Sequence, residues 1–243
     1  MTEEPVPVPV PGLGKARRIL AALFGELVLY PQPGDPNRRQ DAYSLFYVRA
    51  AALGLSGWQT SEGEVGEGFT TFQVVLGDDK LTPVQPFLAV VEDVTTRLGR
   101  LRLDAIQVRL PERDTSERTA LGQSAEWFTF LDAALRVSVR VTLDSADERI
   151  TTMTAPATMD QMRGQQGLLP YQDVFTYDAP SEDHLVLLAI PPATGDGHHR
   201  ATFTGTLAEW SFDALGWLGA YLNDLAARSG ITTSLTFNVE KLT

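Results

Sequence analysis

A hydrophobic pattern that occurs twice, 131 positions apart, is the feature that most constrains the fold of this chain. Residues 69–110 read as a strand, a helix with hydrophobic side chains at helical spacing, and a second strand. Residues 201–239 follow the same order. The two copies align without a gap at the following pairs: Phe72 with Phe203, Leu76 with Leu207, Phe87 with Leu218, Val91 with Leu222, Val94 with Leu225, Gly99 with Gly230, Ile106 with Phe237, and Val108 with Val239.

Turn-forming residues mark the ends of both expected helices. Thr82 and Pro83 predict an N-cap and a first-turn proline for the first helix, and Gly99 predicts its end. Ser211 and Gly230 predict the corresponding ends of the second helix. Two unrelated strand–helix–strand units can converge on such a pattern. The shared flanking strands and closing glycines favour a duplication.

Outside the two copies, the pattern is less regular. Residues 14–30 carry hydrophobic side chains at helical spacing and predict a helix, and the aromatic residues at 43–53 favour a strand over a helix. The apolar parity along residues 101–110 changes at Ala105, which predicts a β-bulge. Further strands are expected at residues 127–143, 149–154 (pairing back as a hairpin), 171–177 and 184–190.

These elements predict an α+β fold. Two β-α-β units related by internal pseudo-symmetry, together with β-hairpins, would form an antiparallel or mixed sheet on which the helices pack. Residues 1–12 alternate Val and Pro and predict an extended or disordered arm. Residues 13–120 form the first expected α+β half and residues 121–243 the second, within one compact unit.

The charge of the chain restricts its partners. The formal net charge is -11, and residues 121–243 carry 15 acidic and 7 basic residues. An acidic surface repels phosphate backbones and anionic lipid headgroups, so neither nucleic acid nor a membrane is an expected partner.

The residue usage also indicates a compartment and a source. Because the chain has no cysteine, disulfides and thiolate metal sites are excluded. We expect a cytoplasmic protein because neither a secretory signal nor an apolar stretch of membrane-spanning length is present. Three lysines stand against 17 arginines, a bias that is associated with high-GC bacterial genomes.

Histidine and carboxylate residues offer one weak metal site. Asp196, His198 and His199 lie close together in sequence, but adjacent side chains on a strand point to opposite faces, so exposed loop histidines are the simpler interpretation. Glu92 and Asp93 are expected on the solvated face of the first helix. No nucleophile elbow, P-loop or dinucleotide-binding motif is present, so no catalytic residue and no cofactor is predicted.

Two tryptophans are candidate interaction residues. Trp58 lies in a predicted loop rich in glycine and glutamate, and Trp210 precedes the second helix of the repeat. Tryptophans in loops often anchor a protein partner, although they also fold back onto the core.

The sequence therefore favours a non-catalytic protein-interaction module, such as an adaptor, chaperone or inhibitor-like protein, that binds a protein partner or self-associates. The alternative is a small-molecule-binding protein or an enzyme with a site in the cleft between the two repeats. A fold alone cannot decide between these classes.

Overall fold

The computed structural model describes residues 17–29, 38–52, 56–62, 69–76, 83–112, 136–154, 176–177, 199–207 and 209–242. Within these ranges the chain is α+β, as predicted, with helices packed on one antiparallel sheet. The elements are β1 (Arg18–Leu29), α1 (Arg38–Ala52), β2 (Ser56–Glu62), β3 (Phe69–Val75), α2 (Val84–Leu98), β4 (Gly99–Leu110), β5 (Val137–Ser145), η3 (Glu148–Thr154), β6 (Thr176–Tyr177), β7 (His199–Leu207), α4 (Phe212–Arg228) and β8 (Leu235–Lys241).

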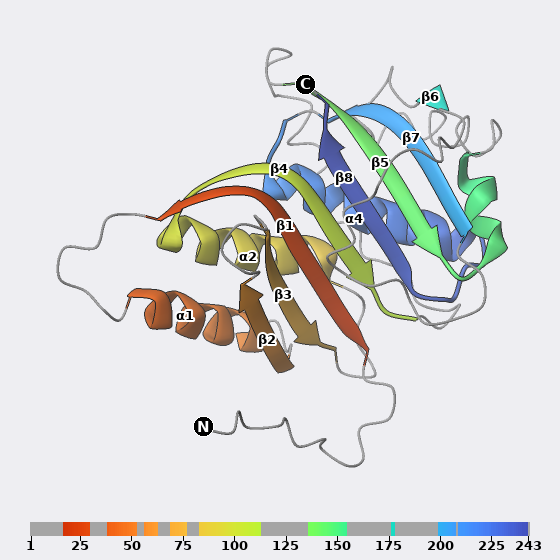
Figure 1. Ribbon diagram of the computed structural model, residues 1–243. Coiled ribbons are helices and arrows are strands. Elements are labelled where there is room, and N and C mark those ends of the chain that lie inside the picture. The colour runs from red at the N-terminus through yellow and green to blue at the C-terminus, as the bar shows by residue number, and fades with distance from the viewer. Residues whose placement is uncertain are drawn as a thin grey trace, which may run out of the picture.

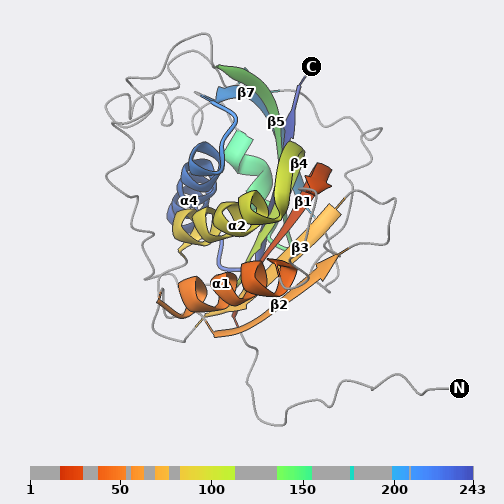
Figure 2. The ribbon, with the colours of Figure 1, turned by 90° about the vertical axis from the view of Figure 1, so that its left-hand side faces the viewer.

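The described strands form one sheet in the order β2-β3-β1-β4-β8-β5-β7-β6 (Figure 1). Neighbouring strands in this order pair antiparallel. The helices α1, α2 and α4 lie in a row on the same side of the sheet (Figure 2). Within the described ranges, helices therefore cover one face of the sheet, and the opposite face, named here the helix-free face, carries none.

The two segments of the repeated pattern fold as β3-α2-β4 and β7-α4-β8. In each segment, a third strand lies between the two predicted ones: β1 between β3 and β4, and β5 between β7 and β8. The order β1-α1-β2-β3-α2-β4 with these neighbours is the split β-α-β arrangement of ferredoxin-like folds. The second half has the same strand order, with η3 in the chain position of α1.

Strand pairing keeps the same register in both halves. Between β4 and β8, Gln107 lies opposite Asn238, which is 131 residues later. On either side of this pair, Ile106 lies opposite Val239 and Val108 opposite Phe237. The partners of the inserted strands keep this offset: Ala21 of β1 lies between Phe72 and Val108, and Val141 of β5 lies between Phe203 and Val239. Ala21 and Val141 themselves are 120 residues apart.

The predicted helix at residues 14–30 is wrong, because residues 18–29 of this segment form strand β1. Ile19, Ala21 and Leu23 join the main core under the helices, while Ala22 and Phe24 are buried on the other face. A strand that buries both faces is a continuous apolar run, and such a run contains a helical stripe by default.

The predicted strand at residues 43–53 is also wrong, because residues 43–52 belong to helix α1. Phe46 and Ala50, four residues apart, are fully buried, and the Phe46 ring lies 5.5 Å from the ring of Phe72. Tyr47 and Val48 are exposed, so the aromatic content that favoured a strand does not reflect burial. Packing of one helical face overrides local β propensity here.

The predicted hairpin strand at residues 149–154 is wrong as well, because these residues form the 3₁₀ helix η3. The Asp147 carboxylate accepts a hydrogen bond from the Arg149 amide at 3.0 Å, which begins the helical turn. Ile150 is fully buried and anchors η3. The described part of the strand predicted at 127–143 is β5, and β6 falls within the predicted 171–177. The strand predicted at 184–190 lies outside the described ranges.

The ends of the two helices differ from each other. In α4, the Ser211 hydroxyl accepts from the Ala214 amide at 3.1 Å and Gly230 has φ +76°, as predicted. In α2, Pro83 takes the N-cap position itself, without a side-chain hydrogen bond, and Thr82 lies outside the described residues. Gly99 ends α2 in an extended conformation with φ -178°, so it is not a left-handed cap.

The bulge predicted near Ala105 is confirmed. Phe24 lies opposite Ala105 and Gly25 opposite Leu103, so Asp104 is the extra residue of β4. Gly25 has φ +150°, and a Cβ atom there would lie 2.0 Å from the Arg102 carbonyl oxygen. The bulge therefore requires glycine on the neighbouring strand.

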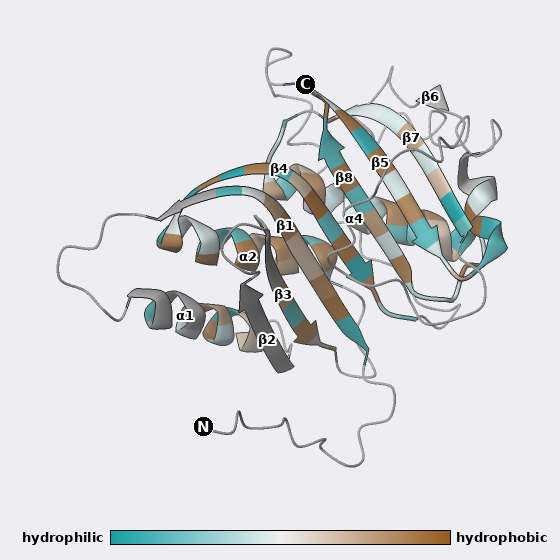
Figure 3. Cartoon of the chain, viewed as in Figure 1, coloured by the Kyte–Doolittle hydropathy of each residue, from teal (hydrophilic) through white to brown (hydrophobic). Residues whose placement is uncertain are grey.

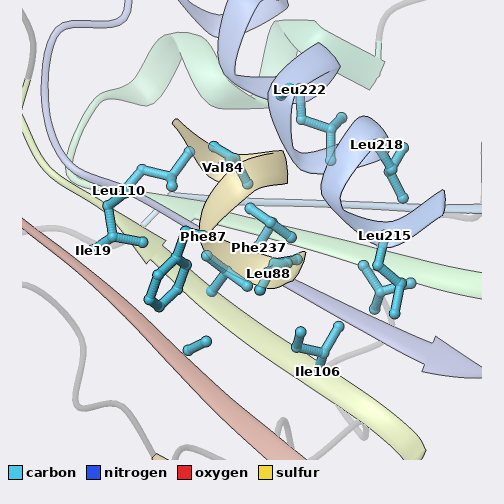
Figure 4. Packing of buried hydrophobic residues seen from close by; sticks show 14 of the residues in the cluster. Ile19, Val84, Phe87, Leu88, Ile106, Leu110, Leu215, Leu218, Leu222 and Phe237 are labelled. Atoms are coloured by element: carbon cyan, nitrogen blue, oxygen red, sulfur yellow. The ribbon is translucent and has the colours of Figure 1, made fainter. Parts of the chain in front are cut away.

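The core lies between the helices and the sheet. Phe87 and Leu88 of α2, Leu215 and Leu218 of α4, and Phe237 of β8 are all buried (Figure 4). Hydrophobic and hydrophilic residues alternate along β4 and β5, as expected for strands with one face on this core (Figure 3). The strand predicted from residue 231 begins at Leu235 and is buried on both faces through Val239.

Candidate interaction site

The described part of the histidine segment is a single residue. His199 is the first residue of β7 and is half-buried, whereas Asp196 and His198 lie outside the described ranges. No group of three or more metal-ligating side chains occurs among the described residues. The pKa of Asp147 is lowered chiefly by its hydrogen bond from Arg149 and, to a lesser degree, by His199.

Trp210 is half-buried and packs against the main core. Its indole N–H donates to the Leu103 carbonyl oxygen at 2.7 Å. The pairing of β4 with β8 begins at Ala105, so Leu103 lies beyond that ladder, next to the bulge. The indole N–H of Trp210 thus forms a hydrogen bond with a carbonyl group of the first half. The role of Trp210 in binding a partner stays a prediction.

Trp58 lies on β2, the outermost described strand at one end of the sheet. Ser56 lies opposite Val75 and Gln59 opposite Gln73, so Gly57 and Trp58 together face one residue of β3. The backbone of Trp58 therefore belongs to a bulge on an edge strand, although the sequence predicted a loop. Bulges of this kind redirect side chains and disrupt regular pairing along an edge.

The sequence in which β2 lies is acidic. Residues 50–79, named here the edge segment, contain five Asp or Glu residues and no Lys or Arg. Natural edge strands are commonly protected from further pairing by lysine or proline. β2 contains neither residue type, but it has a bulge and one charged residue, Glu62, and both are features that discourage further pairing.

The junction between the two halves is closely packed where α2 meets α4. A Cβ atom on Gly216 would lie 2.9 Å from the Gln85 Cα atom, so the two helix backbones are nearly in contact. A Cβ atom on Gly219 would lie 2.5 Å from the Phe237 ring and 2.8 Å from Val84. Protein atoms fill this part of the junction, and no ligand fits between the helices at these positions.

One carboxylate near this junction, that of Glu92, has a raised pKa. The pKa of Glu92 is raised by partial burial and then by the negative charges of Asp213, Asp93 and Glu209. Asp93 pairs with Arg49 at 3.4 Å, and the Ser211 hydroxyl donates to Glu209 at 2.6 Å. The sequence placed Glu92 on a solvated face, because the approach of α4 cannot be read from the residues of α2.

The helix-free face differs between the two halves. In the first half, Leu20, Ala22 and Phe24 of β1 form a small apolar cluster with Ala105. At the corresponding register, β5 carries Arg140, Thr142 and Asp144. The polar side chains make three contacts: Arg140 with Glu240 at 3.6 Å, Arg200 with Asp144 at 2.9 Å, and Thr142 with Thr202 at 3.4 Å.

Comparisons with known proteins add no functional assignment. No protein-family model matches the chain, and no curated protein matches it. One similar solved structure, described as an unknown protein from Galdieria sulphuraria, covers 94% of this chain and 99% of its own, at 8% sequence identity and a TM-score of 0.24. A TM-score this low supports no conclusion about fold or function. No helix in the described part of the chain has the length and apolarity needed to cross a membrane.

Proposed function

We propose that this chain is a non-catalytic protein-interaction module of the bacterial cytoplasm, an adaptor, chaperone or inhibitor-like protein. Two β-α-β units related by internal pseudo-twofold symmetry form its framework. The matching registers support this symmetry: Ile106 pairs with Val239 and Val108 with Phe237, as a twofold axis through the Gln107–Asn238 pair requires. Such an arrangement presents a long sheet with two ends rather than a closed active site.

The packing of α2 against α4 is the observation that carries this proposal. Small-molecule sites commonly lie where two domains or repeats meet, and they need a concave pocket. Here Gly216 and Gly219 allow the two helices and β8 to fill that space. The charge of -11 then favours a basic protein partner, because electrostatic steering accelerates the association of oppositely charged surfaces.

A capture experiment from native lysate tests the proposal. The immobilised chain should retain a basic protein that is released when the salt concentration rises from about 0.05 M to about 0.5 M, as screening predicts. Mass spectrometry of the bound material should identify proteins and small molecules in the same eluate. An eluate that contains only a metabolite would contradict the interaction function.

The alternative function is a small-molecule-binding protein or an enzyme with a site near the junction of the halves. The raised pKa of Glu92 favours it, because perturbed carboxyl groups are common in functional sites. A metabolite screen by thermal shift tests this alternative. It requires a ligand that stabilises the wild type but does not stabilise the Glu92→Gln variant.

A further inference from the structure

We infer that an exposed apolar face of helix α1 is the docking site for residues 5–11 of the same chain, the Val-Pro run of the N-terminal arm. This contact goes beyond the proposed function, because it involves no partner protein. Tyr47 and Val48 of α1 are its starting point. Their exposed fractions are 44% and 67%, and they are the large hydrophobic side chains that stand exposed in the described part of the chain.

The helical spacing of α1 gives this face a shape that suits an extended segment. Ser44 and Ala51 are both exposed and lie about two turns apart. Each residue of a helix is rotated by about 100° from the last, so Tyr47 and Val48 project on either side of the line that joins Ser44 to Ala51. α1 lies at the end of the row of described helices, next to α2 (Figure 2). The face therefore presents two larger side chains with small ones between them.

The Val-Pro run has the chemistry that such a face binds. Residues 5–11 alternate Pro and Val, a pattern that favours the polyproline II conformation. A segment that is already extended loses little conformational entropy on docking. Proline-rich segments commonly bind against exposed aromatic rings, and Tyr47 supplies such a ring.

The charges on both sides of the contact also agree. Arg49 follows Val48, and 56% of its side chain is exposed beside its ion pair with Asp93. Glu3 and Glu4 directly precede the Val-Pro run. Opposite charges favour and orient such a contact, so the acidic start of the arm is attracted to the side of the face that carries Arg49.

The described chain begins close enough to α1 for the run to reach this face. Arg18 lies opposite Val75, and Val75 lies opposite Ser56, so β1 starts two strands, or about 10 Å, from the start of β2. α1 ends four residues before Ser56, which places Val48 no more than about 30 Å from Arg17. Residues 5–11 precede Arg17 by 6 to 12 positions. An extended arm carries them about 20–40 Å from it.

The tether favours the arm of the same chain over the arm of a second copy. A segment on a short flexible linker acts at an effective concentration on the order of mM, which exceeds ordinary protein concentrations. Two copies also repel each other, because each carries a net charge of -11. We therefore commit to an intramolecular contact.

A spin label on the arm tests this contact in the full chain. The chain has no cysteine, so Val8→Cys gives a unique labelling site in the middle of the Val-Pro run. Paramagnetic broadening of the NMR signals is expected at residues 44–52, with reduction of the label restoring their intensities. Absent broadening there, or equal broadening over every surface within reach of the arm, would overturn the inference.

Variants on both sides of the contact separate docking from mere proximity. Tyr47→Ser with Val48→Ser changes two exposed side chains and should abolish the selective broadening of α1. Val6→Ser with Val10→Ser should do the same and leaves the described residues unchanged. Thr96→Ala, on the exposed face of α2, is the matched control and should leave the broadening as it is. Selective broadening that survives both double variants would show that this apolar face is not the docking site.

A mixed sample distinguishes the two possible sources of the arm. Spin-labelled chain without ¹⁵N is combined with ¹⁵N-labelled chain without the spin label, and no broadening of α1 is expected. Broadening in the mixture would mean that the arm docks on a second copy, which overturns the intramolecular contact. The capture of a basic lysate protein does not depend on any of these results, so failure of this inference and failure of the proposed function are distinguishable.

Discussion

Gln107 and Asn238 lie directly opposite each other on β4 and β8, and they are also equivalent positions of the two copies of the sequence pattern. A residue can pair with its own equivalent only at a local twofold axis. Both side chains are buried, at 0% and 3% exposure, so this polar pair lies in a tightly packed part of the sheet. The contact between β4 and β8 is an antiparallel pairing, and under the proposed pseudo-symmetry these two strands are equivalent.

A disulfide between these positions tests the register. The chain has no cysteine, so the double variant Gln107→Cys with Asn238→Cys has no background thiol. Directly opposite residues have Cβ atoms close enough to bridge, whereas diagonal neighbours are about 7–8 Å apart. Under oxidation, mass spectrometry should find the bond in this variant. In the control, Gln107→Cys with Thr236→Cys, the bond should be absent, and comparable yields in both would contradict the register.

Gly219→Ala should destabilise the protein although alanine favours helices. The added methyl group would lie closer to the Phe237 ring and to Val84 than a normal van der Waals contact allows. The free energy of unfolding should therefore fall by about 1–3 kcal/mol. Denaturant unfolding measures this change. Thr96→Ala on the exposed face of α2 is the control and should stay within about 0.5 kcal/mol of the wild type. A stabilised Gly219→Ala variant would show that α4 and β8 are farther apart.

Trp210→Phe isolates the hydrogen bond to Leu103. The substitution keeps most of the aromatic packing but leaves the Leu103 carbonyl without its indole donor. We expect a loss of about 1–2 kcal/mol in the free energy of unfolding. Hydrogen exchange around the β4 bulge should also be faster in this variant than in the wild type. Exchange in β5 should be the same in both proteins and serves as the internal reference. Unchanged stability would mean that water replaces the indole without cost.

The raised pKa of Tyr221 predicts that the folded protein loses stability at high pH. Burial raises its pKa to about 12 from the ordinary value of 10, and the Tyr221 ring stacks on Trp217. Because the folded state holds the proton more tightly than the unfolded state, the contribution is complete below pH 10 and is lost between about pH 10 and pH 12. Urea unfolding across this range should show a steeper decline for the wild type than for Tyr221→Phe. Parallel curves would contradict the shift.

Glu92→Gln should stabilise the protein at neutral pH. The raised pKa of Glu92 means that the folded state favours its protonated form, so the ionised form is unfavourable at pH 7. The gain over wild type should disappear as the pH falls below the ordinary range of a glutamate. Glu26→Gln is the control, because its exposed pair with Arg102 at 3.7 Å contributes about 0–1 kcal/mol and Glu26 is not among the charges that raise the pKa of Glu92. Destabilisation by Glu92→Gln at pH 7 would contradict this account.

The sequence predicts best those elements that have one buried face. In α2, Phe87, Val91 and Val94 face the core together, so their spacing identified the helix and its equivalent α4. In β1, both faces are buried and the spacing indicated a helix instead. The insertion of β1 and β5 between predicted neighbours depends on contacts between distant residues, which local patterns do not contain.

The candidate site was less predictable than the fold. Trp58 was singled out as a loop residue, but its position on an edge strand follows from the pairing with β3. The bond of Trp210 to Leu103 joins residues 107 positions apart, and no spacing rule connects them. The acidic composition of residues 50–79 was visible in the sequence, but the place of β2 at one end of the described sheet was not.

The difference between Phe24 and Asp144 has a consequence for the history of the chain. Phe24 lies opposite Ala105, and Asp144 lies opposite Thr236. Thr236 follows Ala105 by 131 residues, so Phe24 and Asp144 have corresponding partners. Under the proposed duplication, an ancestor with a single unit would have assembled from two identical subunits, and every mutation would have appeared in both. Under that proposal, fusion into one gene would have allowed each half to acquire its own residues, and the two ends of the sheet would be able to evolve towards different ligands.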